Sequence, residues 1–265
     1  MSYRSIISLM PKTSVDADAQ AFLTAAAITD PTISSSINKL VVDLKSAGVW
    51  TKMKAIYPMV GGTASTHKFN LKDPRDLNAA FRLQFLGGVT HSSNGVEGNG
   101  TNGYANTFLS PASSLTQNST HISFYSRTNI SANQVEIGAL GTNSIERVTM
   151  ALSFSGNFSS DLYNTTTGRV AAANENSTGF YVGSRINSTT HKAFKNNSQL
   201  GSTNTGASGN ISLILNSIEV LRFNSAFYST KQCAFSSIGD GLTDTEAANL
   251  YTAVQNFQTT LNRQV

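Results

Sequence analysis

The side chains that could do chemistry in this chain are few and lie far apart in the sequence. A β-sandwich that hydrolyses a glycosidic bond needs two carboxylates, about 5–10 Å apart, on the same face of its strands. The acidic residues in and around the predicted strands are isolated, and none has a partner at i, i+2 or i, i+4: Glu136, Glu146, Asp161, Glu175 and Glu219. The residues therefore predict no hydrolase and no enzyme.

The four histidines and the single cysteine also form no recognisable site. Zinc sites need Cys, His, Asp or Glu at characteristic spacings, which are missing around every histidine, namely His67, His91, His121 and His191. Cys233 lies in an apolar stretch where no neighbour would lower its pKa, and one cysteine cannot form an internal disulfide. We expect polar histidines of strands and loops, an inert thiol and no metal.

Contact with a glycan or a protein partner is the chemistry that the polar loops favour. The stretch 87–106 is rich in Gly and Asn, and Asn-Gly turns begin at Asn94, Asn99 and Asn102. Long loops of this kind are often functional. Aromatic rings among polar residues can stack on sugars, with ordinary packing as the alternative. The candidate rings are Tyr104, Phe158 and Tyr163.

Composition excludes two further classes of function. Only 13% of the 265 residues are charged, against about a quarter in typical proteins, and Asn, Ser, Thr and Gly take their place. The formal net charge is +4, but no cluster of Lys and Arg forms the basic footprint of a nucleic-acid-binding protein. No apolar run reaches the roughly 18 residues of a membrane helix. We expect neither nucleic-acid binding nor membrane insertion.

The elements that must position any contact residues begin with a helical region over residues 1–62. Pro31 suits the start of a helix and Gly48 its end. The apolar residues between them repeat at helical spacing, and the only tryptophan follows. We expect this stripe to attach the protein to its neighbours, with packing on its own sandwich as the alternative for the tryptophan: Ile33, Ile37, Leu40, Leu44 and Trp50.

From residue 63 onward, short apolar stretches alternate with polar turns, which is typical of an all-β sandwich. Phe81, Leu83 and Phe85 alternate as one strand. The stretch 211–215 is almost wholly apolar and is expected to be a central strand. Further strands are expected at 121–127, 135–139, 147–154, 169–172, 179–185, 191–194 and 226–235.

A helix is expected to close the sandwich. Thr243 and Glu246 have the spacing of a capping box, in which each side chain bonds the backbone amide of the other residue. The apolar residues that follow occupy one helical face, and we expect that face to pack on the protein's own sheet. They are Ala247, Leu250, Tyr251, Val254, Phe257 and Leu261.

The closing segment Ile-Gly-Asp-Gly-Leu-Thr-Asp-Thr-Glu-Ala-Ala-Asn-Leu-Tyr, residues 238–251, resembles the end of laminin G-like domains. Together with residues 71–83, 179–185 and 191–196, it resembles a module of tailed-phage virion proteins. The resemblance implies a mainly β, concanavalin A-like jelly-roll sandwich with an N-terminal helical segment and a C-terminal helix. It divides the chain into an attachment region, 1–62, and a sandwich, 63–265.

This resemblance also implies a function. The first expectation is a non-enzymatic phage structural protein located in the virion, on a tail fibre, baseplate or adhesion device. A capsid decoration protein and a free-standing carbohydrate-binding, lectin-like module are the alternatives. The implied partners are other virion proteins, further copies of the chain in a homo-oligomer, and a host-surface glycan.

No cofactor is expected. Laminin G-like domains sometimes bind calcium at the rim, where Asp161 and Asp240 are the candidates in this chain. Two scattered carboxylates are thin support for a cation that prefers six to eight oxygen ligands.

Overall fold

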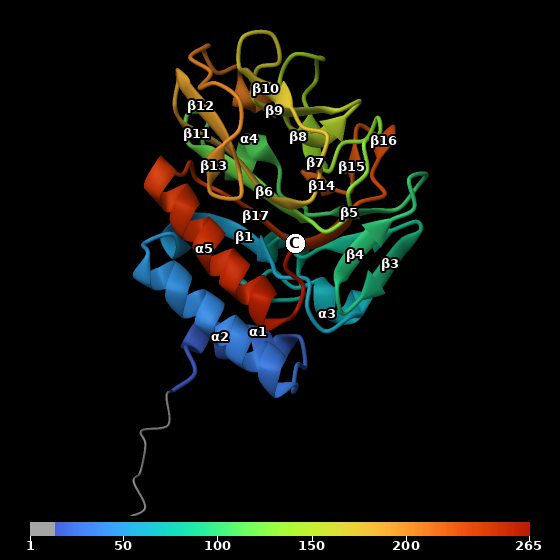
Figure 1. Cartoon of the computed structure of the whole chain (residues 1–265), viewed down its shortest axis with the longest axis vertical. Coiled ribbons are helices and arrows are strands. Elements are labelled where there is room, and N and C mark those ends of the chain that lie inside the picture. The colour runs from blue at the N-terminus through green and yellow to red at the C-terminus, as the bar shows by residue number, and fades with distance from the viewer. Residues whose placement is uncertain (1–13) are drawn as a thin grey trace, which may run out of the picture.

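Two antiparallel β-sheets pack face to face in this chain, and helices cover the outer side of one of them (Figure 1). The structure is a computed structural model that describes residues 14–265. The predicted concanavalin A-like sandwich, with helices before it and one after it, is confirmed.

The first sheet has eight strands. Its order is β13 (Ser198–Gln199), β12 (Thr190–Lys195), β11 (Gly179–Asn187), β6 (Thr120–Ser126), β17 (Gln232–Gly239), β4 (Gly95–Gly98) and β3 (Val89–Ser92), and β1 (Met53–Tyr57) also pairs with β17. The predicted N-terminal region thus contributes a strand to the sandwich, because β1 lies within residues 1–62. Residues 1–13 of that region lie outside the described range.

The second sheet has seven strands. Its order is β10 (Arg169–Ala173), β9 (Asn157–Leu162), β8 (Arg147–Phe154), β7 (Ile137–Leu140), β14 (Glu219–Val220), β5 (Tyr104–Asn106) and β2 (Gln84–Leu86). A separate hairpin joins β15 (Arg222–Phe223) to β16 (Phe227–Tyr228). Because β15 packs against β7, this hairpin lies on the seven-stranded sheet.

The longer helices are α1 (Ala17–Ala25), α2 (Pro31–Ser46) and α5 (Asp244–Thr260). Short turns of helix complete the chain: η1 (Trp50–Lys52), α3 (Ala64–His67), η2 (Asn78–Ala80), α4 (Pro111–Ser114) and η3 (Ile211–Leu213). The predicted capping box at the start of α5 is present, since the Thr243 hydroxyl accepts from the Glu246 amide and the Glu246 carboxylate accepts from the Thr243 amide. Among residues 14–265, no helix is both long and apolar enough to cross a membrane.

The alternation of side chains along each strand separates two main cores. Ile122 and Phe124 of β6 meet Met150 and Leu152 of β8 in the core between the sheets. The opposite face of the eight-stranded sheet, which includes Tyr125, forms a second core with α1, α2 and α5. Figure 1 shows these three helices grouped on one side of the molecule.

The structure contradicts the assembly face that was predicted on the N-terminal helices. Ile37, Leu40 and Leu44 are at most 1% exposed and Trp50 is 7% exposed, because they pack in the core that α2 shares with α5 and the sheet. Ile33 is only half-buried and packs against the same core. These side chains hold the helices to their own sandwich and are not presented to a neighbouring subunit.

The predicted strand at 211–215 is absent, and the predicted strand around Phe81 is wrong in part. Residues 211–215 form a turn of 3-10 helix followed by Leu215, which is 65% exposed, because the Asn210 side chain accepts from the Ser212 amide and caps that turn. The predicted strand around Phe81 begins only at Gln84, since Phe81 has φ of 58° and ends η2. The expected contact loop 87–106 is largely built from β3, β4 and β5.

Candidate functional site

The outer face of the seven-stranded sheet is not covered by the helix layer, which lies on the other sheet. The hairpin β15–β16 lies on this face, where Phe223 packs on Ala151 and Val135. Cavities of about 430 and 220 Å³ open beside the hairpin, which contributes residues to both. We name them the Arg222 cavity and the Arg147 cavity, after a side chain that lines each.

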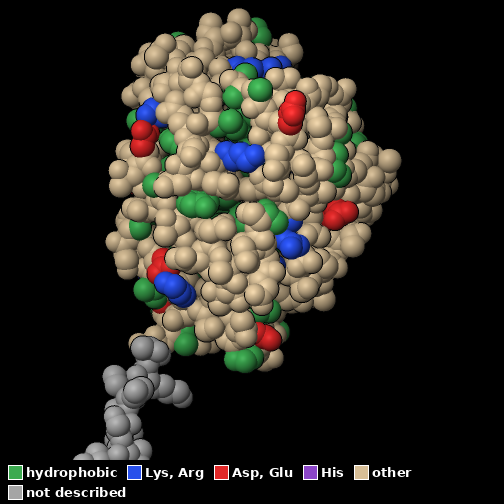
Figure 2. All heavy atoms as spheres, viewed as in Figure 1, with side chains coloured by type: hydrophobic (Ala, Val, Ile, Leu, Met, Phe, Trp, Pro, Cys, Tyr) green, Lys and Arg blue, Asp and Glu red, His purple; other side chains and the backbone are tan. Residues whose placement is uncertain are grey.

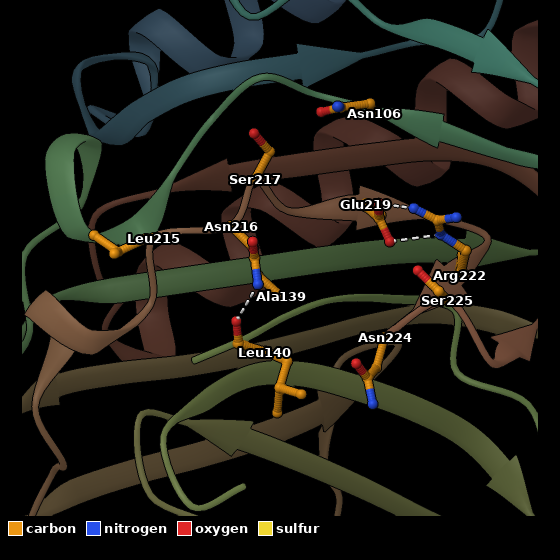
Figure 3. Close-up of a pocket in the computed structure, with 10 residues that line it drawn as sticks. All are labelled: Asn106, Ala139, Leu140, Leu215, Asn216, Ser217, Glu219, Arg222, Asn224 and Ser225. Atoms are coloured by element: carbon orange, nitrogen blue, oxygen red, sulfur yellow. Dashed lines mark hydrogen bonds and ion pairs between the residues drawn. The ribbon is translucent and has the colours of Figure 1, made fainter. Parts of the chain in front are cut away.

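The Arg222 cavity is larger and mostly polar. It lies over β7, β14 and β5, and Figure 3 shows the residues that line it: Asn106, Ala139, Leu140, Leu215, Asn216, Ser217, Glu219, Arg222, Asn224 and Ser225. Asn216 closes one side by donating to the Leu140 carbonyl oxygen at 2.9 Å. Its volume lies within the range of about 300–1,000 Å³ that is usual for small-molecule sites.

Arg222 organises this cavity through several contacts. Its Nε donates to Glu219 Oε2 at 2.7 Å, and Nη2 bonds the other carboxylate oxygen. Its guanidinium carbon lies 3.3 Å from the ring centroid of Tyr104, and Nη1 is 3.4 Å from the Tyr228 hydroxyl. Burial alone would lower the pKa of Arg222, but the hydrogen bonds to Glu219 and Tyr228 outweigh it and raise that pKa.

The Arg147 cavity combines aromatic rings with cationic and hydroxyl groups. It lies over β8 and β9, next to β10, and is lined by Val135, Arg147, Thr149, Ala151, Phe154, Ser159, Arg169, Phe223 and Phe227. Alternation along β8 places Arg147, Thr149 and Ala151 on the same side of the sheet, opposite Val148 and Met150 in the core.

The two arginines of this cavity differ in their partners. Arg169 holds Asp161 by two hydrogen bonds, Nε to Oδ1 at 2.8 Å and Nη2 to Oδ2 at 2.6 Å, and this contact raises the pKa of Arg169. Thr149 also donates to Asp161, at 3.0 Å. Arg147 donates through Nη2 to the Ser144 carbonyl oxygen, and burial lowers the pKa of Arg147.

Chemically, this face offers hydrogen-bond donors and acceptors beside aromatic rings. The carboxylates nearest the cavities, Asp161 and Glu219, are each held by an arginine. Among residues 14–265, no group of three or more His, Cys, Asp or Glu side chains is placed to hold a metal ion. On the molecular face drawn in Figure 2, charged side chains are sparse, and some of them lie beside a side chain of opposite charge.

The structure separates the predicted aromatic contacts. Tyr104 is half-buried on β5, and its ring contacts Arg222 beside the larger cavity. The prediction of sugar contacts at Tyr163 and Phe158 is wrong, because both residues are fully buried in the core between the sheets. The Tyr163 hydroxyl bonds Thr120 Oγ1 inside the protein, so a glycan cannot reach it.

The predicted asparagines lie away from both cavities. Asn94 is at the turn between β3 and β4, on the edge of the other sheet. Asn99 Oδ1 accepts from the backbone amides of residues 101–103, and Asn102 Oδ1 accepts from the Gly88 amide at 3.0 Å. The side chain of Asn99 stabilises its own turn and that of Asn102 links this turn to Gly88, while both residues remain exposed and their role as contacts stays a prediction.

The two predicted calcium ligands do not form a site together. Both oxygens of Asp161 are bonded to Arg169. Asp240 follows β17 on the other sheet, 3.8 Å from Lys54, and its carbonyl oxygen is 2.6 Å from Nδ1 of His121. Each group already has a cationic or hydrogen-bonding partner within the protein.

Arg147 and Arg222 are the site residues that sequence reasoning missed. The alternation in β8 could have placed Arg147 on the face opposite the core, with Thr149 and Ala151. Arg222 had no such signal, because β14 and β15 are only two residues long. Its position depends on a hairpin that packs on strands distant in sequence.

No protein-family model matches the sequence, and a search of the curated proteins found no match. Solved structures do match. A mutant of Trypanosoma rangeli sialidase with trans-sialidase activity has a TM-score of 0.55 at 10% identity, over 85% of this chain and 39% of that chain. Domain 4 of AbnA, a GH43 extracellular arabinanase from Geobacillus stearothermophilus, solved with arabinotriose, has a TM-score of 0.50 at 10% identity, over 75% of this chain and 98% of that domain.

NanB sialidase from Streptococcus pneumoniae matches at a TM-score of 0.41 and 10% identity, over 51% of this chain. The chain spans only 24% of the NanB chain. The matches to the Trypanosoma rangeli sialidase and to domain 4 of AbnA concern the fold alone, and they agree with a concanavalin A-like sandwich.

Proposed function

We propose that the protein is a carbohydrate-binding, lectin-like β-sandwich module that uses the outer face of its seven-stranded sheet. The observation that carries this proposal is the Arg222 cavity, about 430 Å³ in volume, where Glu219, Arg222, Ser217 and Asn224 converge beside Tyr104. Sugars are recognised by such combinations of planar polar groups, hydroxyls and aromatic rings.

The structural neighbours support the proposal. Domain 4 of AbnA shares the fold over 75% of this chain, and its structure contains arabinotriose. Sharing a fold does not establish a shared ligand, so the argument depends on the cavity in this chain. The neighbour shows that a sandwich of this architecture accommodates an oligosaccharide.

We also propose that the module is not an enzyme. A glycosidase needs one carboxylate ready to donate a proton and another ready to act as base or nucleophile. Glu219 is tied to Arg222, and Asp161 is tied to Arg169. The two carboxylates nearest the cavities are therefore already bonded to arginines and are not arranged as a free pair on either side of a bound glycosidic oxygen.

The direct test is a glycan array followed by titration calorimetry with the best ligand. Glu219→Gln keeps the shape of the cavity but removes a charged acceptor, and we expect it to weaken binding about tenfold, which corresponds to about 1.4 kcal/mol. Glu175→Gln makes the same change on an exposed loop outside both cavities and is the matched control. Absence of saturable binding to every glycan on the array would refute the proposal.

We place this module on the exterior of a tailed-phage virion, on a fibre, baseplate or adhesion device, with the capsid exterior as the alternative. The support is the sequence resemblance of residues 71–83, 179–185, 191–196 and 238–251, together with the low charge. Mass spectrometry of purified particles tests this placement. Detection of the protein only as a free species, never in particles, would refute it without affecting the glycan-binding proposal.

A further inference from the structure

We infer that the Arg147 cavity binds the anionic group of an acidic sugar, a carboxylate or a sulfate. This inference rests on the proposed glycan-binding function and names the class of ligand. The cavity holds a cationic side chain without a carboxylate partner, free hydrogen-bond donors, and an aromatic wall next to them.

The charges around the cavity do not balance. Arg147 and Arg169 both line it, and Asp161 beneath them is the carboxylate that faces them. Asp161 is already bonded through both oxygens to Arg169. Within residues 14–265, no carboxylate lies within 4.0 Å of the Arg147 guanidinium, so the cavity carries an excess of one positive charge.

Donors remain free on the same side chains. Arg147 uses Nη2 for the Ser144 carbonyl oxygen, while its Nε is buried without a partner. Among the described residues, Nη1 of Arg147, Nη1 of Arg169 and the half-buried Ser159 hydroxyl have no hydrogen-bond acceptor. Carboxylate and sulfate oxygens fit this set, because charge-assisted bonds to guanidinium groups are among the strongest in proteins.

The wall of the cavity suits the rest of a sugar. Phe227 lies between Phe154 and Phe223, with ring centroids 5.9 Å from the first and 6.3 Å from the second. Phe154 and Phe227 are only half-buried, so their rings are accessible. The apolar face of a pyranose can pack on such rings, and Arg147, whose guanidinium carbon is 5.6 Å from the Phe223 centroid, lies next to them.

A neutral sugar would leave the charge of Arg147 uncompensated. Burying a charged group without a partner is costly, and a ligand that also displaces water from the guanidinium would increase that cost. An anionic sugar removes this cost, because its negative charge compensates the positive charge of Arg147. We therefore expect acidic glycans to bind more tightly than neutral glycans of the same length.

The test compares three probes by titration calorimetry: tetragalacturonate, its fully methyl-esterified form, and a chondroitin sulfate tetrasaccharide. We expect at least tenfold tighter binding of an anionic probe than of the neutral ester. Arg147→Gln should remove this preference, and Arg147→Lys should retain part of it, because Lys keeps the charge but not the planar geometry. Arg75→Gln removes an equal charge at a site 64% exposed and outside the cavity, and should change nothing.

The outcomes separate this inference from the function on which it rests. Preference for either anionic probe over the neutral ester supports the inference, and tight binding of tetragalacturonate shows that a carboxylate alone is sufficient. Equal binding of charged and neutral probes, or full anionic preference in a folded Arg147→Gln variant, overturns it and leaves glycan binding intact. If none of the probes binds and the glycan array is also flat, both proposals fail together.

Discussion

The guanidinium carbon of Arg222 lies 3.3 Å from the ring centroid of Tyr104, and the same side chain holds Glu219. Tyr104, which the sequence indicated as a sugar contact, therefore stacks against Arg222, which the sequence did not indicate as a site residue. Because Arg222 contacts Tyr104 and also lines the cavity, it links the aromatic ring to the polar groups that a ligand would meet.

Replacing Arg222 by lysine tests this link. Lys keeps the positive charge but cannot hold Glu219 through two parallel bonds or stack as a plane on Tyr104. We expect Arg222→Lys to lower glycan affinity roughly tenfold and the free energy of unfolding by about 1 kcal/mol. Calorimetry and urea denaturation measure the two effects, with Arg75→Lys as control. Unchanged affinity would show that the larger cavity is not the glycan site.

Tyr163 should matter for stability and not for binding. It is fully buried between the sheets, and its hydroxyl bonds Thr120. We expect Tyr163→Ala to cost about 3–5 kcal/mol by leaving a cavity in the core, and Tyr163→Phe to cost only about 1 kcal/mol. Urea denaturation measures both. A Tyr163→Phe protein that folds normally but loses glycan binding would contradict the buried position.

The buried histidines predict a loss of stability in acid. Burial lowers the pKa of His121 and of His191 to about 4, against about 6.5 in an unfolded chain. Between these values the unfolded chain binds more protons, so stability falls as the pH drops from about 6.5 toward 4, and this contribution is flat above about pH 7. The loss should reach roughly 3 kcal/mol for each histidine.

Urea denaturation at pH 7.0, 5.5 and 4.5 follows this loss, and NMR titration of the imidazole protons assigns it. Burial keeps each ring neutral, although the ring nitrogens bond a backbone carbonyl oxygen that opposes the shift, that of Asp240 for His121 and that of Gly168 for His191. Imidazoles that titrate near pH 6.5 in the folded protein would contradict the predicted shift.

A truncated chain that begins at Thr63 should not fold. It would lack β1, which pairs with β17, and would lack α2, whose Leu40 and Leu44 are fully or almost fully buried in the core shared with α5. We expect circular dichroism and one-dimensional NMR to show an unfolded or aggregated chain, while the full chain is folded. A cooperative thermal transition in the truncated protein would show that residues 1–62 are an independent attachment region.

Local patterns in the sequence were enough to predict much of the fold. Short apolar stretches between polar turns predicted the strands that became β6, β8, β11 and part of β17, because these strands are buried on both faces along most of their length. The Thr243–Glu246 capping box predicted the start of α5 because the bond partners are only three residues apart. The spacing of the carboxylates also led to the expectation that the protein is not a hydrolase, which stays a prediction.

Tertiary structure decided which of these faces remain accessible. The stripe of Ile37, Leu40 and Leu44 has the same amphipathic pattern whether it meets a neighbour or its own sheet, and only the packed chain buries it. Tyr104 and Tyr163 likewise look alike among polar residues, yet one lies by a cavity and the other in the core. Arg222 meets Tyr104 because residues more than a hundred positions apart become neighbours when the sheet forms, and no local spacing encodes that contact.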